Sequence, residues 1–262
     1  MSEDTILYEV RDGLAHVTLN RPDAANAFDL DFVRAFHRVM IDCDKNRAVR
    51  AVLLTGAGKM FSAGGDLKFF LQAGDRVASV LAEMTTSLHT AIAVMNRMDA
   101  PVVVAVNGMA AGGGMSLALT GDVVIAAESA RFTMAYTAGG LSPDGSSTWF
   151  LPRLVGFRRA KELALTNRML SAAEAMEAGI VDRVVPDSKL MAEAEKQARA
   201  FAEGPTGAYG AVKRLMIESF QNGLETQMEL ESRAIAARAA SADGREGVGA
   251  FAEKRKPTFT GE

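Results

Sequence analysis

Residues 101–121, PVVVAVNGMAAGGGMSLALTG, place three consecutive glycines between two apolar runs. The first run is β-branched and short, as a buried strand is, and the second begins a helix. Glycines at such a junction serve either close packing of a strand against a helix or a ligand that contacts bare backbone. N–H groups at a helix N-terminus favour a negatively charged ligand. The triplet alone does not distinguish these two roles.

A second stretch, FSAGGDLK at residues 61–68, repeats this pattern. An apolar strand leads to two glycines, and the acidic Asp66 opens a helix. Two strand-to-helix turns of this kind can each direct one backbone N–H toward the same oxygen, which is how an oxyanion hole is built. The two stretches together therefore favour an oxyanion hole more strongly than either stretch does alone.

The composition excludes several classes of protein. Hydrophobic residues make up 48% of the 262 residues, which predicts one large globular domain, with or without a small appendage. The 29 basic and 32 acidic residues form no block of one sign, so no nucleic-acid partner is expected. Cys43 is the single cysteine, which excludes an intrachain disulfide and a thiolate metal cluster.

Targeting signals are not evident in the sequence. The start, MSEDTILYEV, is acidic and polar where a signal peptide is basic and then apolar. No stretch reaches the roughly 18 uninterrupted apolar residues of a membrane-spanning helix. We therefore expect a cytoplasmic protein with no membrane partner.

The order of elements predicts an α/β fold built from repeated strand–strand–helix units. ILYEV and LAHVTLN flank an Asp12-Gly13 turn as a β-hairpin, and helical spacing follows over 29–44. The same order recurs through 51–74, a helix over 76–98, and the strands and helix of 102–133. Such units cover one another's apolar faces as a spiral of layers. After Pro186 the pattern predicts helices over 188–203, 206–221, 223–240 and 243–253.

The stretches quoted above, together with LPRLVGFRRAKELALTNRMLSAAEAMEAGIVDRVV at 151–185, resemble the crotonase (enoyl-CoA hydratase/isomerase) superfamily. The resemblance implies a crotonase-like spiral of ββα units over residues 1–203 that holds an acyl-CoA site. It also implies that residues 204–262 form a helical region that covers the CoA site and drives assembly into homotrimers or hexamers. The substrate would be an acyl-CoA thioester, with no separate cofactor and no metal.

By the same resemblance, the amides of Gly65 and Gly113 hold the thioester oxygen. Proton removal beside a thioester carbonyl places negative charge on that oxygen, and fixed N–H donors stabilise the charge as it develops. The substrate site implied by the resemblance also includes Ala24, Asn26, Ala63, Asp66, Leu67, His89, Met109, Ser116, Tyr136 and Leu141.

The sequence departs from its family at two catalytic positions. Hydratases of the family carry a glutamate on the helix after the triplet and a second one after the next strand, and here these positions hold Ser116 and Tyr136. A carboxylate pair takes a proton from water and returns one to carbon. Serine and tyrosine are too weakly acidic for that role without activation. Ordinary hydratase chemistry is therefore not expected.

Asp144, in LSPDGSS, lies where several isomerases of the superfamily carry an acidic residue. Local pattern alone favours a helix cap in a turn, whereas the family position favours a catalytic carboxylate. Leu141, Trp149 and Phe150 are expected to desolvate Asp144 and so raise its pKa. One carboxylate that moves one proton between two carbons is sufficient for a double-bond shift.

A further resemblance, over 135–168, is to the 4-chlorobenzoyl-CoA dehalogenase branch, in which the matching aspartate is a nucleophile and a histidine at the position of His89 is catalytic. Leu88 and Tyr136 stand where that branch carries tryptophans. A histidine in SLHTAIAVM is more commonly a core or surface residue.

Four functions therefore remain open. We expect first an acyl-CoA double-bond or ring isomerase, with a variant similar to the phenylacetyl-CoA pathway isomerase included. The others are a hydratase that uses Asp144 alone, a dehalogenase with an aspartyl intermediate, and a non-catalytic acyl-CoA binder.

Overall fold

The computed structural model describes residues 5–262, and its strands form two sheets. The sequence MSED, from which part of the targeting prediction was drawn, occupies residues 1–4 and lies outside the described residues. In spatial order, the larger sheet contains β1 (Ile6–Arg11), β2 (Leu14–Leu19), β3 (Ala51–Gly56), β5 (Val102–Val106), β7 (Val123–Ala127) and β10 (Arg183–Val185). The smaller sheet contains β4 (Met60–Ser62), β6 (Met109–Ala111), β8 (Arg131–Thr133) and β9 (Leu170–Ser171).

The chain enters the larger sheet through the predicted hairpin of β1 and β2. Asp12 and Gly13 both have positive φ angles, 50° and 79°, as a two-residue turn between twisted strands requires. The two strands pair antiparallel, with Ile6 opposite Leu19. β2, β3, β5, β7 and β10 are then parallel neighbours. The predicted hairpin is confirmed.

Successive strand pairs divide between the two sheets. β3, β5 and β7 join the larger sheet, whereas β4, β6 and β8 run parallel to one another in the smaller one. α1 (Leu30–Lys45) follows the hairpin of β1 and β2. α2 (Leu67–Ala73) follows β3 and β4, and α4 (Gly113–Ala118) follows β5 and β6. This is the predicted spiral of ββα layers. Because β4 and β6 are parallel neighbours, the turns that leave their carboxyl ends lie at the same edge.

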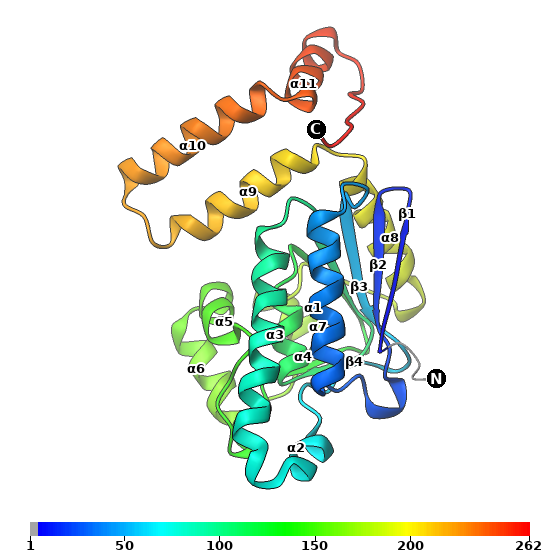
Figure 1. Cartoon of the computed structure of the whole chain (residues 1–262), viewed down its shortest axis with the longest axis vertical. Helices are drawn as coiled ribbons and strands as arrows, with labels where there is room; N and C mark the ends of the chain where they lie inside the picture. The colour runs from blue at the N-terminus through cyan, green and yellow to red at the C-terminus, as the bar shows by residue number, and fades with distance from the viewer. Residues whose placement is uncertain (1–4) are drawn as a thin grey trace.

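Helices cover the sheets. The predicted helices over 29–44 and 76–98 correspond to α1 and α3 (Val77–Arg97), which lie side by side (Figure 1). α1 begins where the Asp29 carboxylate accepts a hydrogen bond from the Phe32 amide. α8 (Leu190–Ala202) packs against β3 and β5. The remaining helices of the body are α5 (Ser147–Val155), α6 (Phe157–Thr166) and α7 (Ala172–Glu177). Short 3-10 turns occur at Pro22–Ala24, Gly74–Arg76, Thr137–Gly139 and Asp187–Lys189.

The helical segment Leu67–Arg97 is the one segment of the described chain that is long and apolar enough to cross a membrane, with a mean hydropathy of 1.3. Only length and composition support that possibility, and the core helix of a globular protein passes the same test. The α3 portion packs against α1. Its buried side chains are Met84, Leu88, Ala91, Ile92 and Met95. These contacts are those of a core helix.

The helices that follow Gly204 form an arm, which we call the C-terminal arm: α9 (Thr206–Ser219), α10 (Leu224–Ala239) and α11 (Ala242–Glu253). The arm projects from the body (Figure 1). Arg50 fixes its base by donating hydrogen bonds to the carbonyls of Gly204 (2.6 Å) and Phe259 (2.9 Å). Buried Lys213 forms an ion pair with Asp122 at 2.7 Å. α10 has no buried residue, so most of its surface has no covering within this chain.

Candidate active site

The two glycine-containing turns are in direct contact. Gly64 has φ +85°, and a Cβ placed on it would lie 2.7 Å from both the Ala111 carbonyl oxygen and the Gly113 nitrogen. Both neighbours are backbone atoms, so neither can move aside as a side chain would. Glycine is therefore required here by its backbone conformation and by the close approach of the two turns.

Two amides at this contact are free to bind a ligand. Within residues 5–262, neither the Gly65 nor the Gly113 N–H donates a hydrogen bond. The neighbouring groups are used, because the Phe28 amide donates to Gly64 and the Asp66 amide donates to Phe28. Gly113 is the first residue of α4, where an N–H has no partner within the helix. Two free donors on touching turns are what an oxyanion hole requires.

An arginine holds the first turn in place. Arg21 contacts Asp29 (2.8 Å) and Asp66 (3.2 Å), and its side chain also donates to the Ala27 carbonyl. Asp66 additionally caps α2 through the amides of Lys68 and Phe69. The Asp66 carboxylate is thus occupied by contacts within the chain, and its position beside Gly65 serves the turn.

The other residues that the resemblance places near the substrate differ in what they offer. Asn26 is fully buried, and its side chain bonds the backbone of Arg21, Ala57 and Met60. The Asn26 side chain is therefore not available to contact the substrate, and only its backbone could do so. Ala24 ends a 3-10 turn, and the Ala63 amide donates a hydrogen bond to the Ala25 carbonyl. Leu67 begins α2, and its side chain is 61% exposed. Met109 begins β6.

The structure brings Ser116, Tyr136 and Asp144 together in one hydrogen-bonded series. The Ser116 and Tyr136 hydroxyls are 2.8 Å apart, and the Tyr136 hydroxyl donates to Asp144 Oδ1 at 2.6 Å. Ser116 Oγ also lies 3.2 Å from the Gly112 carbonyl. The series therefore runs from the turn that carries the Gly113 amide to the one carboxylate singled out in the sequence.

Asp144 does not cap the following helix with its side chain. α5 has Ser146 at its N-cap and no side-chain cap hydrogen bond, and it is the Asp144 carbonyl that accepts from Ser147. The cap alternative is therefore wrong. The expected desolvation is incomplete as well, because the Asp144 side chain is 33% exposed and Leu141 is 38% exposed.

Trp149 packs on Phe150, with ring centroids 4.6 Å apart, and also reaches the C-terminal arm. Its ring meets the Phe220 ring of the C-terminal arm edge to face, with centroids 5.4 Å apart, and the Arg153 guanidinium lies 4.1 Å from the Trp149 centroid. Sequence gave no reason to place Phe220 there, because 71 positions separate the two rings. The helix that follows Asp144 thus contacts the arm.

His89 lies beside Asp144. Its Nε2 accepts a hydrogen bond from the Gly145 amide at 3.1 Å and is 3.9 Å from Asp144 Oδ2. The side chain is half exposed. The histidine is therefore a neighbour of the carboxylate, and its Nε2 carries no proton in this arrangement.

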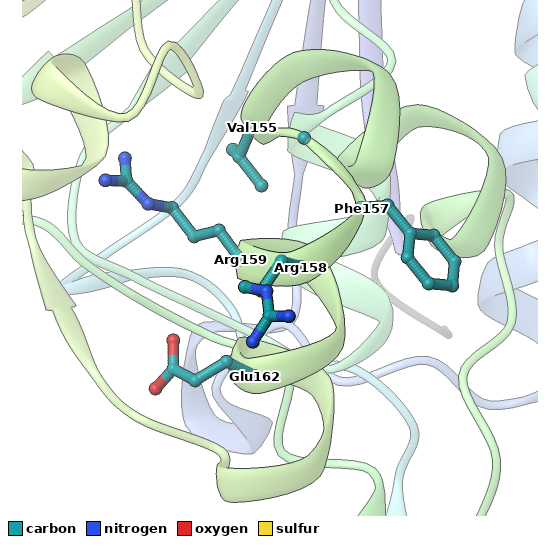
Figure 2. Close-up of a pocket in the computed structure, with 6 residues that line it drawn as sticks. Val155, Phe157, Arg158, Arg159 and Glu162 are labelled. Carbon is teal, nitrogen blue, oxygen red and sulfur yellow. The ribbon is translucent and has the colours of Figure 1, made fainter.

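A separate hollow of about 640 Å³ lies where α5 meets α6. It is lined by Val155, Gly156, Phe157, Arg158, Arg159 and Glu162. Figure 2 shows the side chains of Phe157 and Arg159 pointing to opposite sides of the first turn of α6. None of the residues around Asp144 described above lines this hollow.

Comparison with known proteins assigns the family. The profile of the enoyl-CoA hydratase/isomerase family matches residues 9–262. The chain belongs to this family. A crystal structure of a putative enoyl-CoA hydratase/isomerase from Mycobacterium abscessus superposes with a TM-score of 0.93 at 33% identity, over 98% of this chain and 100% of that one. The α/β spiral predicted from sequence is thereby confirmed.

Two relatives within the family carry different names. A probable enoyl-CoA hydratase from Rhodobacter capsulatus is 42% identical over 100% of both chains. A 1,2-epoxyphenylacetyl-CoA isomerase from Escherichia coli is 40% identical over 98% of both. The protein is thus an enzyme of the enoyl-CoA hydratase/isomerase family that acts on acyl-CoA.

Sequence reasoning missed Gly64 and Arg21 as parts of the site. Gly64 stands within the quoted glycine pair, and its role depends on the approach of a turn almost fifty residues away. Arg21 lies in NRPDAANAF, where nothing local indicates that two aspartates will converge on it. Among residues 5–262 no group of three or more His, Cys, Asp or Glu residues could hold a metal ion.

Proposed function

We propose that the protein is an acyl-CoA isomerase in which Asp144 moves a proton between two carbons of the acyl chain. In a 3-enoyl-CoA, Asp144 takes a proton from the carbon beside the thioester carbonyl and returns it two carbons beyond that position. The double bond shifts into conjugation, and no atom is gained or lost. The Gly65 and Gly113 amides stabilise the negative charge that the thioester oxygen carries in between.

The arrangement of the former glutamate positions is the observation that supports this proposal most strongly. Ser116 bonds Tyr136, and Tyr136 bonds Asp144, which supports Asp144 as the acid–base group of the site. A single carboxylate suits transfer of one proton within the substrate. The 1,2-epoxyphenylacetyl-CoA isomerase from Escherichia coli, a relative 40% identical over 98% of both chains, also supports the proposal.

The direct test measures the absorbance of the conjugated thioester formed from a 3-enoyl-CoA. Asp144→Asn should abolish turnover, because the amide cannot take the proton. Asp75→Asn, at an exposed position of the turn before α3, is the matched control and should retain wild-type turnover. Full activity of Asp144→Asn would refute the assignment of the base.

Hydration of a 2-enoyl-CoA is the second candidate, because a relative 42% identical to this chain is named a probable enoyl-CoA hydratase. Asp144 would then activate water without a partner carboxylate. Loss of the crotonyl-CoA absorbance in the presence of the enzyme, at a rate that exceeds the isomerisation rate, would favour this function.

We also propose that the enzyme assembles into a trimer, or into a hexamer formed by two trimers, through the C-terminal arm, and that it is cytoplasmic. Large exposed apolar side chains along α9 and α10 support this assembly, since such patches mark interaction sites. They are Val212, Met216, Phe220, Leu224, Met228 and Ile235. Light scattering after gel filtration should give three or six times the chain mass, and a monomer would refute the proposal.

A further inference from the structure

The two positions from which catalytic glutamates are missing hold hydroxyl groups that point toward the same carboxylate. Ser116 is fully buried on α4, and Tyr136 precedes the 3-10 turn at Thr137–Gly139. Their oxygens lie 2.8 Å apart, and the Tyr136 oxygen lies 2.6 Å from Asp144 Oδ1. Gly145 packs closely on the same helix, since a Cβ placed on it would lie 3.0 Å from Ser116 Cβ. The loop that carries Asp144 is therefore held against α4.

The direction of these hydrogen bonds follows from which groups carry protons. An ionised carboxylate only accepts, so the Tyr136 proton lies in the bond to Asp144 Oδ1. The Tyr136 oxygen is then the acceptor in its 2.8 Å contact with the Ser116 hydroxyl, whose one proton is shared with the Gly112 carbonyl at 3.2 Å. Burial and the adjacent Asp144 charge raise the pKa of Tyr136 well above its usual value. Tyr136 therefore keeps its proton for the hydrogen bond to Asp144 near neutral pH.

The two oxygens of Asp144 differ in consequence. Oδ1 is occupied by a short, charge-assisted hydrogen bond. Oδ2 faces His89 Nε2 at 3.9 Å, and that nitrogen already accepts a hydrogen bond from the Gly145 amide. His89 thus offers Oδ2 no proton in this arrangement. One oxygen is fixed, and the other is free to exchange a proton with a substrate.

We infer that Tyr136, oriented by Ser116, is a positioning residue that binds Oδ1 of Asp144 and reserves Oδ2 for proton transfer. This inference rests on the proposed function, in which Asp144 is the base. It also gives Ser116 and Tyr136 a role: where hydratases of the family carry two glutamates, this chain carries two hydroxyls that orient a third residue, Asp144.

The inference predicts a change in the pH dependence of turnover. The titratable groups that face Asp144 are Tyr136, from the loop before the Thr137–Gly139 turn, and His89, from α3. A hydrogen bond that stabilises the charged form of a carboxylate lowers its pKa. Removal of the Tyr136 hydroxyl, which donates to Asp144 Oδ1, should therefore move the acid limb of the kcat/KM profile upward.

The experiment compares pH profiles of Tyr136→Phe and Tyr8→Phe. Tyr8 is a matched control, because its hydroxyl also donates to an aspartate, Asp42, at 2.5 Å, and that pair lies between β1 and α1. Tyr8→Phe should leave the acid limb in place. Ser116→Ala should move the limb in the same direction as Tyr136→Phe but by less, because Tyr136 loses only its orienting donor.

The contribution of His89 is separated by repeating Tyr136→Phe in a His89→Gln background, where the same upward shift is expected. If Tyr136→Phe does not fold, uniform replacement of tyrosine by 3-fluorotyrosine replaces the substitution. The fluorinated phenol is a stronger donor, so the acid limb should move downward. An unmoved limb in either experiment would overturn the inference.

Failure of the inference can be told apart from failure of the proposed function. If Asp144→Asn retains turnover, Asp144 is not the base and the proposed function falls. If Asp144→Asn is inactive and Tyr136→Phe keeps the wild-type pH profile, Asp144 remains the base and only the role of Tyr136 is wrong. A shift of equal size in Tyr8→Phe would overturn the inference as well.

Discussion

Substitution of Gly64 by alanine should damage the proposed oxyanion hole without changing Gly65 or Gly113, the two residues proposed as donors. The backbone at Gly64 is left-handed, with φ +85°, and an alanine in that region costs about 1–2 kcal/mol. The new methyl group would also lie 2.7 Å from the Ala111 oxygen and from the Gly113 nitrogen. Overpacking of this kind adds about 1–3 kcal/mol. We expect the free energy of unfolding to fall by about 2–5 kcal/mol.

The loss of kcat in Gly64→Ala should exceed the loss that reduced stability alone would cause. Relief of the clash requires the two turns to separate by roughly 0.5–1 Å, since ordinary carbon contacts begin near 3.5 Å. Catalytic groups tolerate displacements of only about 0.5 Å. The Gly113 amide is itself one of the atoms that must move. Loss of one oxyanion donor lowers kcat by about 10²–10³-fold, and we expect a decrease of that size.

The assay is kcat on any acyl-CoA thioester that the wild-type enzyme turns over, measured alongside thermal unfolding. Gly249→Ala is the matched control, because a Cβ at Gly249, in α11, would meet no atom within 4 Å. The control should keep wild-type kcat. A Gly64→Ala enzyme with wild-type kcat would refute the reasoning that the contact between the turns sets the donor geometry.

Three further predictions concern the C-terminal arm, two of them its contacts with the body and one a contact within the arm. Lys213→Met leaves the Asp122 charge buried without its partner, so the free energy of unfolding should fall by about 3–5 kcal/mol in a denaturant titration; an unchanged midpoint would contradict this. Hydrogen bonds from the Arg255 guanidinium and the Thr258 amide lower the pKa of Glu246 to about 2. The stabilisation that these bonds give is therefore complete above pH 4.5 and is lost as the pH falls toward 2. The difference in Tm between wild type and Glu246→Gln should disappear over that range, and a constant difference would count against the prediction. A double-mutant cycle on Trp149→Ala and Phe220→Ala should give a coupling energy of about 0.5–1.5 kcal/mol, whereas independent effects would show that the two rings do not meet in solution.

Local pattern was a good guide to the elements because an element's period is set by its own backbone. The spacing of apolar residues over 29–44 predicted α1, and Asp12-Gly13 predicted the hairpin turn, since both depend on neighbours a few positions away. The two glycine-containing turns could also be found this way, because each lies between a strand and a helix in the sequence. These features needed no knowledge of what packs against what.

The partners of the polar side chains could not be predicted in the same way. Asp66 opens a helix as expected, yet its carboxylate also contacts Arg21, 45 positions earlier. Trp149 packs on Phe220 in the arm, 71 positions later in the chain. Both outcomes depend on contacts between distant segments, which local spacing does not encode.

The sequence by itself determined the succession of strands and helices and the two glycine turns, and its resemblance to the family singled out Ser116, Tyr136 and Asp144. Only the tertiary structure decided that the turns touch at Gly64, that Asp144 does not cap α5, and that Tyr136 binds one of its two oxygens. The reason is physical. Backbone periodicity is fixed by geometry within a few residues, whereas the atom that a side chain finally meets is fixed by how separate layers stack.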